Sequence, residues 1–160
     1  MATRRGGRDA VSTPRAGRTM QGTILCLVDD NPHGRAALRA AADLGDRLRL
    51  RLVLAHVADG VDGVGAEGDA VRTRRREGAA LLVARLAAEL GLSDRTEHRT
   101  AVGDPATVLG QIAAEEAADL IVVGAPAGRR LRRSSETRIA EHLESATTVP
   151  VLFVRPRRVR

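Results

Sequence analysis

The sequence predicts an α/β domain of three layers, in which helices cover both faces of a parallel sheet. Apolar runs alternate with helix-like segments along the chain, and the runs 120–123 and 151–154 are apolar at successive positions. A strand that is apolar at every position is buried on both faces, which is typical of a parallel sheet covered by helices. The 160 residues suffice for one such domain with a substantial core.

The predicted strands and helices alternate from residue 23 to the end of the chain. In order, they are strand 23–29, a helix from Pro32, strand 50–57, a mobile loop 58–68, helix 69–90, strand 96–102, helix 105–117, strand 119–124, a ligand loop 124–136, a helix-like segment and strand 150–155. Asn31 and Asp104 are the predicted N-caps, because each precedes a proline that suits the first helical turn. The core stripe expected for helix 69–90 is Ala79, Leu82, Val83, Leu86 and Leu90.

The net charge of +6 is concentrated at the two ends of the chain. Residues 1–20 contain five Arg and one Asp, residues 155–160 contain four Arg, and residues 21–154 contain 17 Arg against 19 acidic residues. The chain has no Trp or Tyr and one Phe, so it lacks an aromatic surface on which bases would stack. We therefore disfavour nucleic-acid binding. The basic run in 71–77 is interpreted as a solvated helix face.

Other functional classes are also disfavoured by the sequence. No apolar run approaches about 18 residues, which argues against a membrane span. Cys26 is the one cysteine, so no internal disulfide can form, and its place in the first apolar run indicates a core thiol. The four histidines lie in different elements, and no catalytic or metal-binding arrangement follows from their spacing. Residues 1–21 are predicted to be a disordered Arg-rich tail, with Met20 as a hypothetical alternative start.

The ordered set of segments resembles the universal stress protein family over residues 22–156, leaving 157–160 as a basic tail. The similarity rests on ILCLVDDN, LVLAHV, GDPATVLGQIAAEEAADLIVVG and TTVPVLFVRP. The resemblance implies a Rossmann-like fold of the adenine nucleotide alpha hydrolase type, with five parallel strands in the order 3-2-1-4-5. It also implies a small cytoplasmic stress-response protein. Because no catalytic arrangement follows from the residues, we expect that the protein is not an enzyme and that any ATP hydrolysis is slow.

Family members that bind ATP carry the pattern Gly, two residues, Gly, nine residues, Gly, then Ser or Thr. Here the pattern begins at Gly124, and its later positions hold Ala127, Thr137 and Arg138, with Gly128 one place late. The resemblance therefore implies an ATP-type crevice whose phosphate motif is degraded. The nucleotide-binding residues that it implies are Leu27, Val28, Asp29, Val57, Val123, Gly124, Ala125, Ala127, Gly128, Thr137, Arg138 and Ile139. Gly124 has an alternative role, as a tight turn after the strand.

Two of these residues are implied at the adenosine end of the ligand. Asp29 would meet adenine and ribose, and the backbone of Val57 would face adenine. Asp29 has an alternative role as a strand-end residue that caps the next turn. Arg138 has two alternatives: it pairs bidentately with phosphate, or it pairs with Glu136 or Glu141 and fills the crevice.

The last strand is predicted to lie at the edge of the sheet. Its residues are Val151, Leu152, Phe153 and Val154. An exposed apolar edge invites pairing with another chain, and the resemblance implies a homodimer formed there; the alternative is a monomer whose edge is guarded by residues 155–160. Three functional hypotheses follow: a nucleotide-responsive switch, a ligand-free scaffold for unknown protein clients, and an Arg-tailed nucleic-acid binder.

Overall fold

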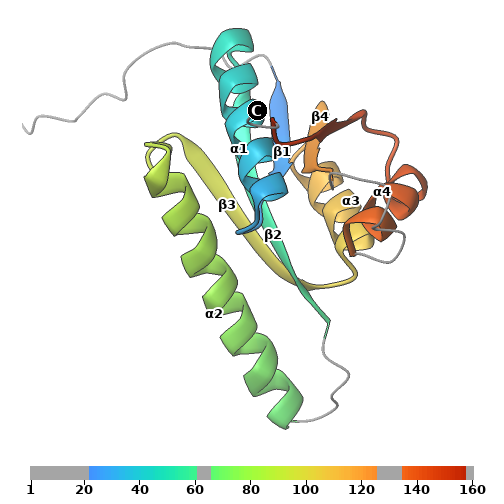
Figure 1. Ribbon diagram of the computed structural model, residues 1–160. Helices are drawn as coiled ribbons and strands as arrows, with labels where there is room; N and C mark the ends of the chain where they lie inside the picture. The colour runs from blue at the N-terminus through green and yellow to red at the C-terminus, as the bar shows by residue number, and fades with distance from the viewer. Residues whose placement is uncertain (1–21, 61–65, 126–134, 158–160) are drawn as a thin grey trace, which may run out of the picture.

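The computed structural model describes residues 22–60, 66–125 and 135–157, and the predicted tail 1–21 lies outside them. Within these residues five strands alternate with four helices (Figure 1). In chain order the elements are β1 (Thr23–Leu27), α1 (Pro32–Leu48), β2 (Arg51–Asp59), α2 (Ala66–Glu89), β3 (Thr96–Gly103), α3 (Pro105–Glu115), β4 (Leu120–Gly124), α4 (Ser135–Ala146) and β5 (Val151–Val154).

The sheet has the order β3-β2-β1-β4-β5, and every neighbouring pair is parallel. The predicted three-layer α/β fold with five parallel strands is therefore confirmed. In the central strand, Cys26 pairs with Leu54 of β2 on one side and with Val122 of β4 on the other. The strand order reverses between β1 and β4, and ligands bind at such a switch point in open α/β sheets.

Helices cover both faces because successive residues of the central strands point to opposite sides. Ile24 and Cys26 pack with Leu38 of α1 and Leu86 of α2 on one face. Leu25 packs on the other face, in a second cluster to which α3 and α4 contribute Leu109, Ile112, Ile139 and Leu143. Figure 1 shows α3 and α4 together on their side of the sheet. Cys26 is fully buried, and this burial raises the pKa of its thiol.

The two predicted N-caps are confirmed. The Asn31 side chain accepts a hydrogen bond from the Gly34 amide at 2.7 Å, and the Asp104 side chain accepts one from the Thr107 amide at 2.9 Å. Each cap satisfies an otherwise unpaired amide at a helix start. Because α1 follows β1 and α3 follows β3, both helix starts lie at the carboxyl edge of the sheet.

The predicted boundaries around residues 58–68 were wrong. β2 continues to Asp59 and α2 begins at Ala66, so both ends of the expected mobile loop belong to these elements, while residues 61–65 lie outside the described part. The sequence of α2 lacks apolar periodicity over its first half, where Arg72 to Glu77 are all exposed. Tertiary context, and not an apolar stripe, therefore determines where this helix begins.

Smaller corrections concern the ends of other elements. Leu90 is 36% exposed because α2 ends at Glu89, and Ala87 takes its expected place in the core. α3 stops at Glu115, two residues early, and the left-handed φ of 48° at Ala117 marks the turn that follows. The first strand ends at Leu27 and not at Asp29. Among the described residues, no helix is both long and apolar enough to cross a membrane.

Candidate functional site

A cavity of about 370 Å³ opens at the carboxyl ends of β1, β2 and β4, where the strand order reverses. Seven of the predicted nucleotide-binding residues line it: Leu27, Val28, Asp29, Val57, Val123, Gly124 and Ile139. They come from β1 and the turn after it, from β2, from β4 and from α4. The fold thus brings together residues that are up to 112 positions apart in the chain, from Leu27 to Ile139.

Fewer of the residues that were predicted to bind phosphate can be placed in the structure. Ala125 does not line the cavity, and its amide donates to the Val154 carbonyl at 2.7 Å, which extends the β4–β5 ladder. Ala127 and Gly128 lie outside the described residues. Thr137 and Arg138 fall in the first turn of α4, but their side chains also lie outside the described part. Their predicted roles stay predictions.

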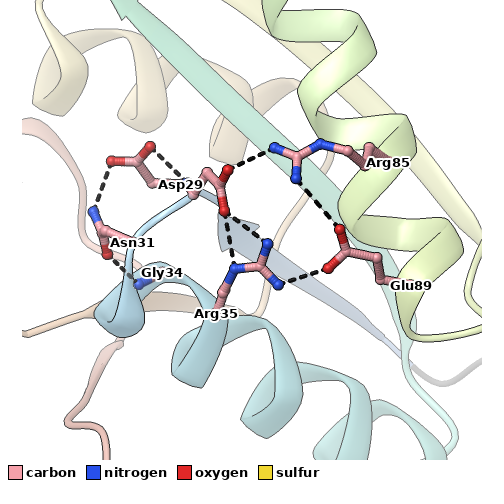
Figure 2. A network of polar contacts seen from close by, with 7 residues as sticks. Asp29, Asn31, Gly34, Arg35, Arg85 and Glu89 are labelled. Atoms are coloured by element: carbon pink, nitrogen blue, oxygen red, sulfur yellow. Dashed lines mark hydrogen bonds and ion pairs between the residues drawn. The ribbon is translucent and has the colours of Figure 1, made fainter.

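The Asp29 carboxylate caps the turn that follows β1, as its alternative role required. One carboxylate oxygen accepts from the Asp30 amide at 2.8 Å, and the other accepts from the Asn31 side-chain amide at 2.9 Å (Figure 2). Asp29 is nevertheless exposed and lines the cavity. Because a carboxylate oxygen accepts more than one hydrogen bond, both oxygens can still receive a ligand hydroxyl or amine.

The residue beside Asp29 is held by a network of two arginines and two acids, which we call the Asp30 network (Figure 2). One oxygen of Asp30 accepts from Arg35 at 2.8 Å and the other from Arg85 at 2.6 Å. Glu89 accepts from the same two arginines, at 2.6 and 3.3 Å. Hydrogen bonds from Arg85 and Arg35 lower the pKa of Asp30, and a hydrogen bond from Arg35 lowers that of Glu89. The network joins the β1–α1 turn to α1 and to the last turns of α2.

Two glycines allow the first turn of α1 to approach the strand ends closely. A Cβ added at Gly124 would lie 2.5 Å from the carbonyl carbon of His33, and one at Gly34 would lie 2.5 Å from the Asp29 carbonyl oxygen. Real Cβ atoms do not come this close to backbone atoms. Gly124 is therefore required by packing against α1, a reason different from the tight turn considered above.

Sequence reasoning missed half of the described residues that line the cavity. These are Asn31, Gly34, His56, Ala58, Asp59, Arg75 and Pro105. Asn31 and Gly34 could have been found, because the predicted N-cap lies two residues after Asp29. Arg75 could not, because it reaches the cavity from α2, where its guanidinium donates to the Asp59 carbonyl at 2.8 Å. His56 contacts the Val28 carbonyl at 2.8 Å. The described residues contain no group of three or more His, Cys, Asp or Glu placed to bind a metal ion.

The fold and the cavity define a small, doubly wound α/β domain with a ligand-sized crevice at its switch point. The chain belongs to the universal stress protein family, whose model matches residues 20–155. No curated protein matches the sequence.

Several solved structures share this fold. One, first described as a hypothetical protein and assigned a biochemical function from its structure, is 21% identical, with 88% of this chain and 99% of that chain covered and a TM-score of 0.72. A universal stress protein in complex with cAMP is 18% identical, with 85% and 98% covered and a TM-score of 0.60. The universal stress protein from Archaeoglobus fulgidus in complex with dAMP is 19% identical, with 84% and 98% covered and a TM-score of 0.53.

Proposed function

We propose that this universal stress protein binds an adenine nucleotide, ATP in the first instance, in the cavity at the β1–β4 switch point, and that it acts as a cytoplasmic stress-response module. The observation that supports this proposal is the convergence of seven predicted binding residues on one cavity of about 370 Å³. Cavities of about 300–1,000 Å³ are typical of small-molecule sites. The cAMP and dAMP complexes of related folds favour adenine nucleotides as the ligand class.

The adenosine end has the groups that it needs. Val28 and Val57 are buried and supply apolar walls against which a base packs. Asp29 supplies a carboxylate that accepts from ribose hydroxyls or from the adenine amine. The phosphate end departs from the ATP-binding pattern at three of its four positions, so phosphate recognition depends on other groups, Arg138 among them.

A ligand-free scaffold is the second candidate, and two contacts favour it. The Asp29 carboxylate already accepts two hydrogen bonds within its own turn. Gly124 is required by its approach to His33. Both residues therefore have a structural reason to be present that involves no nucleotide.

We also propose that the protein is a homodimer formed by antiparallel pairing of two β5 strands. β5 is an edge strand, and among the described residues only β4 pairs with it. Leu152 and Phe153 on this edge are 39% and 38% exposed. Exposed apolar edges of this kind template pairing with a second chain. The two-fold axis would make the contact self-complementary.

Isothermal calorimetry with adenosine and with Mg-ATP tests the nucleotide proposal. Asp29→Asn keeps an acceptor for the Asp30 amide but removes the negative charge, so we expect about tenfold weaker binding of both ligands. Asp43→Asn is the matched control, because Asp43 lies on the exposed surface of α1, where it pairs with Arg47. Its affinity should equal that of the wild type.

The same titrations decide between the two candidates. Wild-type protein that binds neither ligand would favour the scaffold. Arg138→Ser separates the two roles of Arg138: weaker ATP binding indicates phosphate recognition, whereas binding gained only in the variant indicates that Arg138 closes the crevice.

A further inference from the structure

The nucleotide cavity is the first of three adjoining hollows along the carboxyl edge of the sheet. A second hollow of about 290 Å³ shares Asp59, Pro105 and Ile139 with the first. A third hollow of about 460 Å³ shares Gly60 and Gly103 with the second. Because both shared residues are glycines, neither places a side chain between the second and third hollows. We call this row of three adjoining hollows, from the end of β4 to α2, the groove.

The charge of the lining changes along this groove. Among the described residues, the first two hollows are lined by the acids Asp29, Asp59 and Asp104 and by one arginine, Arg75. Among the residues that the structure describes, the third hollow is lined by Arg72 and Arg76 against one acid, Asp69. The terminal phosphate of a bound nucleotide is therefore favoured in the third hollow, where it would meet two guanidinium groups, over the second hollow with Asp59 and Asp104.

The helical spacing of these arginines directs them to a common face. Arg72, Arg75 and Arg76 occupy positions i, i+3 and i+4, which are neighbours on a helix surface. Arg75 is fixed at the boundary of the first hollow by its hydrogen bond to the Asp59 carbonyl. Arg74 lies on a different face and lines none of the three hollows. Figure 1 shows the N-terminal half of α2 extending beyond the end of β2.

Arg72 and Arg76 also differ in their pairing from several arginines of the folded body. Arg35, Arg51 and Arg85 each contact a carboxylate. Arg72 and Arg76 are exposed, and neither forms an ion pair with an acid among the residues that the structure describes. Their guanidinium groups are therefore available to an anion from outside the chain.

We propose that Arg72 and Arg76 form a phosphate subsite, so that the ligand is an adenine nucleotide with a phosphate chain that extends along the groove to α2. This inference rests on the proposed nucleotide function, which supplies the adenosine end. Guanidinium groups bind phosphate bidentately, so this pair supplies the recognition that the degraded motif after Gly124 lacks. Phosphate would then be recognised by α2, which lies outside the motif that begins at Gly124.

Calorimetry of Mg-ATP and adenosine against three proteins tests the subsite. The proteins are the wild type, the double variant Arg72→Gln/Arg76→Gln, and the control pair Arg74→Gln/Arg39→Gln, which removes the same charge outside the groove. We expect the double variant to bind ATP about tenfold more weakly and adenosine unchanged. The control should match the wild type for both ligands. An unchanged ATP affinity in the double variant, or an equal loss in the control, would overturn the subsite.

A second titration separates failure of the subsite from failure of the nucleotide function. Sodium tripolyphosphate carries the anion without the base, and backbone amide NMR locates where it binds. Shifts concentrated at Arg72, Arg76 and Gly103, and absent in the double variant, support the subsite even if adenosine fails to bind. Shifts spread over all arginine-rich surfaces, or no shifts at α2, contradict it.

Discussion

The backbone of His33 occupies the space into which a side chain at Gly124 would project, with a closest distance of 2.5 Å from the Cβ position to the carbonyl carbon. Gly124→Ala should therefore destabilise the fold by about 2–3 kcal/mol, because the first turn of α1 must move away from β4. Urea unfolding followed by circular dichroism, at a fixed protein concentration, measures this change. Gly78→Ala is the control: nothing lies within 4 Å of its Cβ position in the exposed part of α2, so it should stabilise by about 0.5–1 kcal/mol. A stable Gly124→Ala protein that loses nucleotide binding would instead assign this glycine to the ligand alone.

The Asp30 network should contribute stability that is lost in acid. Its arginines lower the folded-state pKa of Asp30 from 3.8 and of Glu89 from 4.5, so the contribution is fully present above these ordinary values. It disappears as the pH falls through the depressed folded-state pKa values, where both carboxylates become protonated. In Arg85→Gln the unfolding temperature should start lower at neutral pH and fall less on acidification, and circular dichroism melts at several pH values would show this.

Arg47→Gln is the matched control for the pH series, because its partner Asp43 lies on the exposed surface of α1, outside the Asp30 network. Its pH profile should parallel that of the wild type. Equal slopes for Arg85→Gln and the wild type would contradict a role for the network in acid stability.

At the amino end of the sheet, the buried Glu116 carboxylate should contribute more to the free energy of unfolding than the exposed neighbour Glu115. The Glu116 side chain is 8% exposed, and it pairs with Arg51 and Arg99. Glu116→Gln leaves both arginines with less charge compensation, so we expect a loss of about 1–2 kcal/mol in unfolding free energy. Glu115→Gln, at the exposed end of α3, should change it by less than about 0.5 kcal/mol. Indistinguishable urea midpoints for the two variants would show that the pairing is energetically neutral.

The proposed dimer predicts a change of mass on substitution at the β5 edge. Phe153→Arg places a charge in the centre of the interface, so the mass in light scattering should fall from about twice 17.0 kDa to that of one chain. Leu81→Arg replaces a side chain that is 73% exposed on α2, and it should leave the mass unchanged. A Phe153→Arg protein with the wild-type mass would place the interface elsewhere or show that the wild type is a monomer.

Much of the fold could be predicted because its signals are local. The continuous apolar run of β4 indicates a strand buried on both faces, and the Asn31-Pro32 and Asp104-Pro105 pairs mark two helix starts. The first half of α2 could not be placed, because its exposed arginines form a helix without an apolar stripe. Its extent depends on the packing of its second half against the sheet.

The candidate site was predictable where the chain itself brings residues to the strand ends. Asp29, Val57 and Gly124 follow from strand-end positions and from the family resemblance, and all three line one cavity. The contribution of Arg75 was not predictable, because it depends on how α2 crosses the end of β2. The packing role of Gly124 also required the structure, because the contact with His33 joins residues 91 positions apart.

Because Cys26 is buried, the rate at which its thiol is labelled can serve as a probe of opening of the sheet. This thiol is the chain's one cysteine, and it lies in the middle strand of the sheet with no exposed surface. Because thiol reagents attack the exposed thiolate, alkylation can proceed only when the central strand opens. The labelling rate therefore reports the opening free energy of the sheet's interior. A nucleotide bound only by the closed sheet would slow that rate in proportion to its occupancy, without any label attached to the ligand.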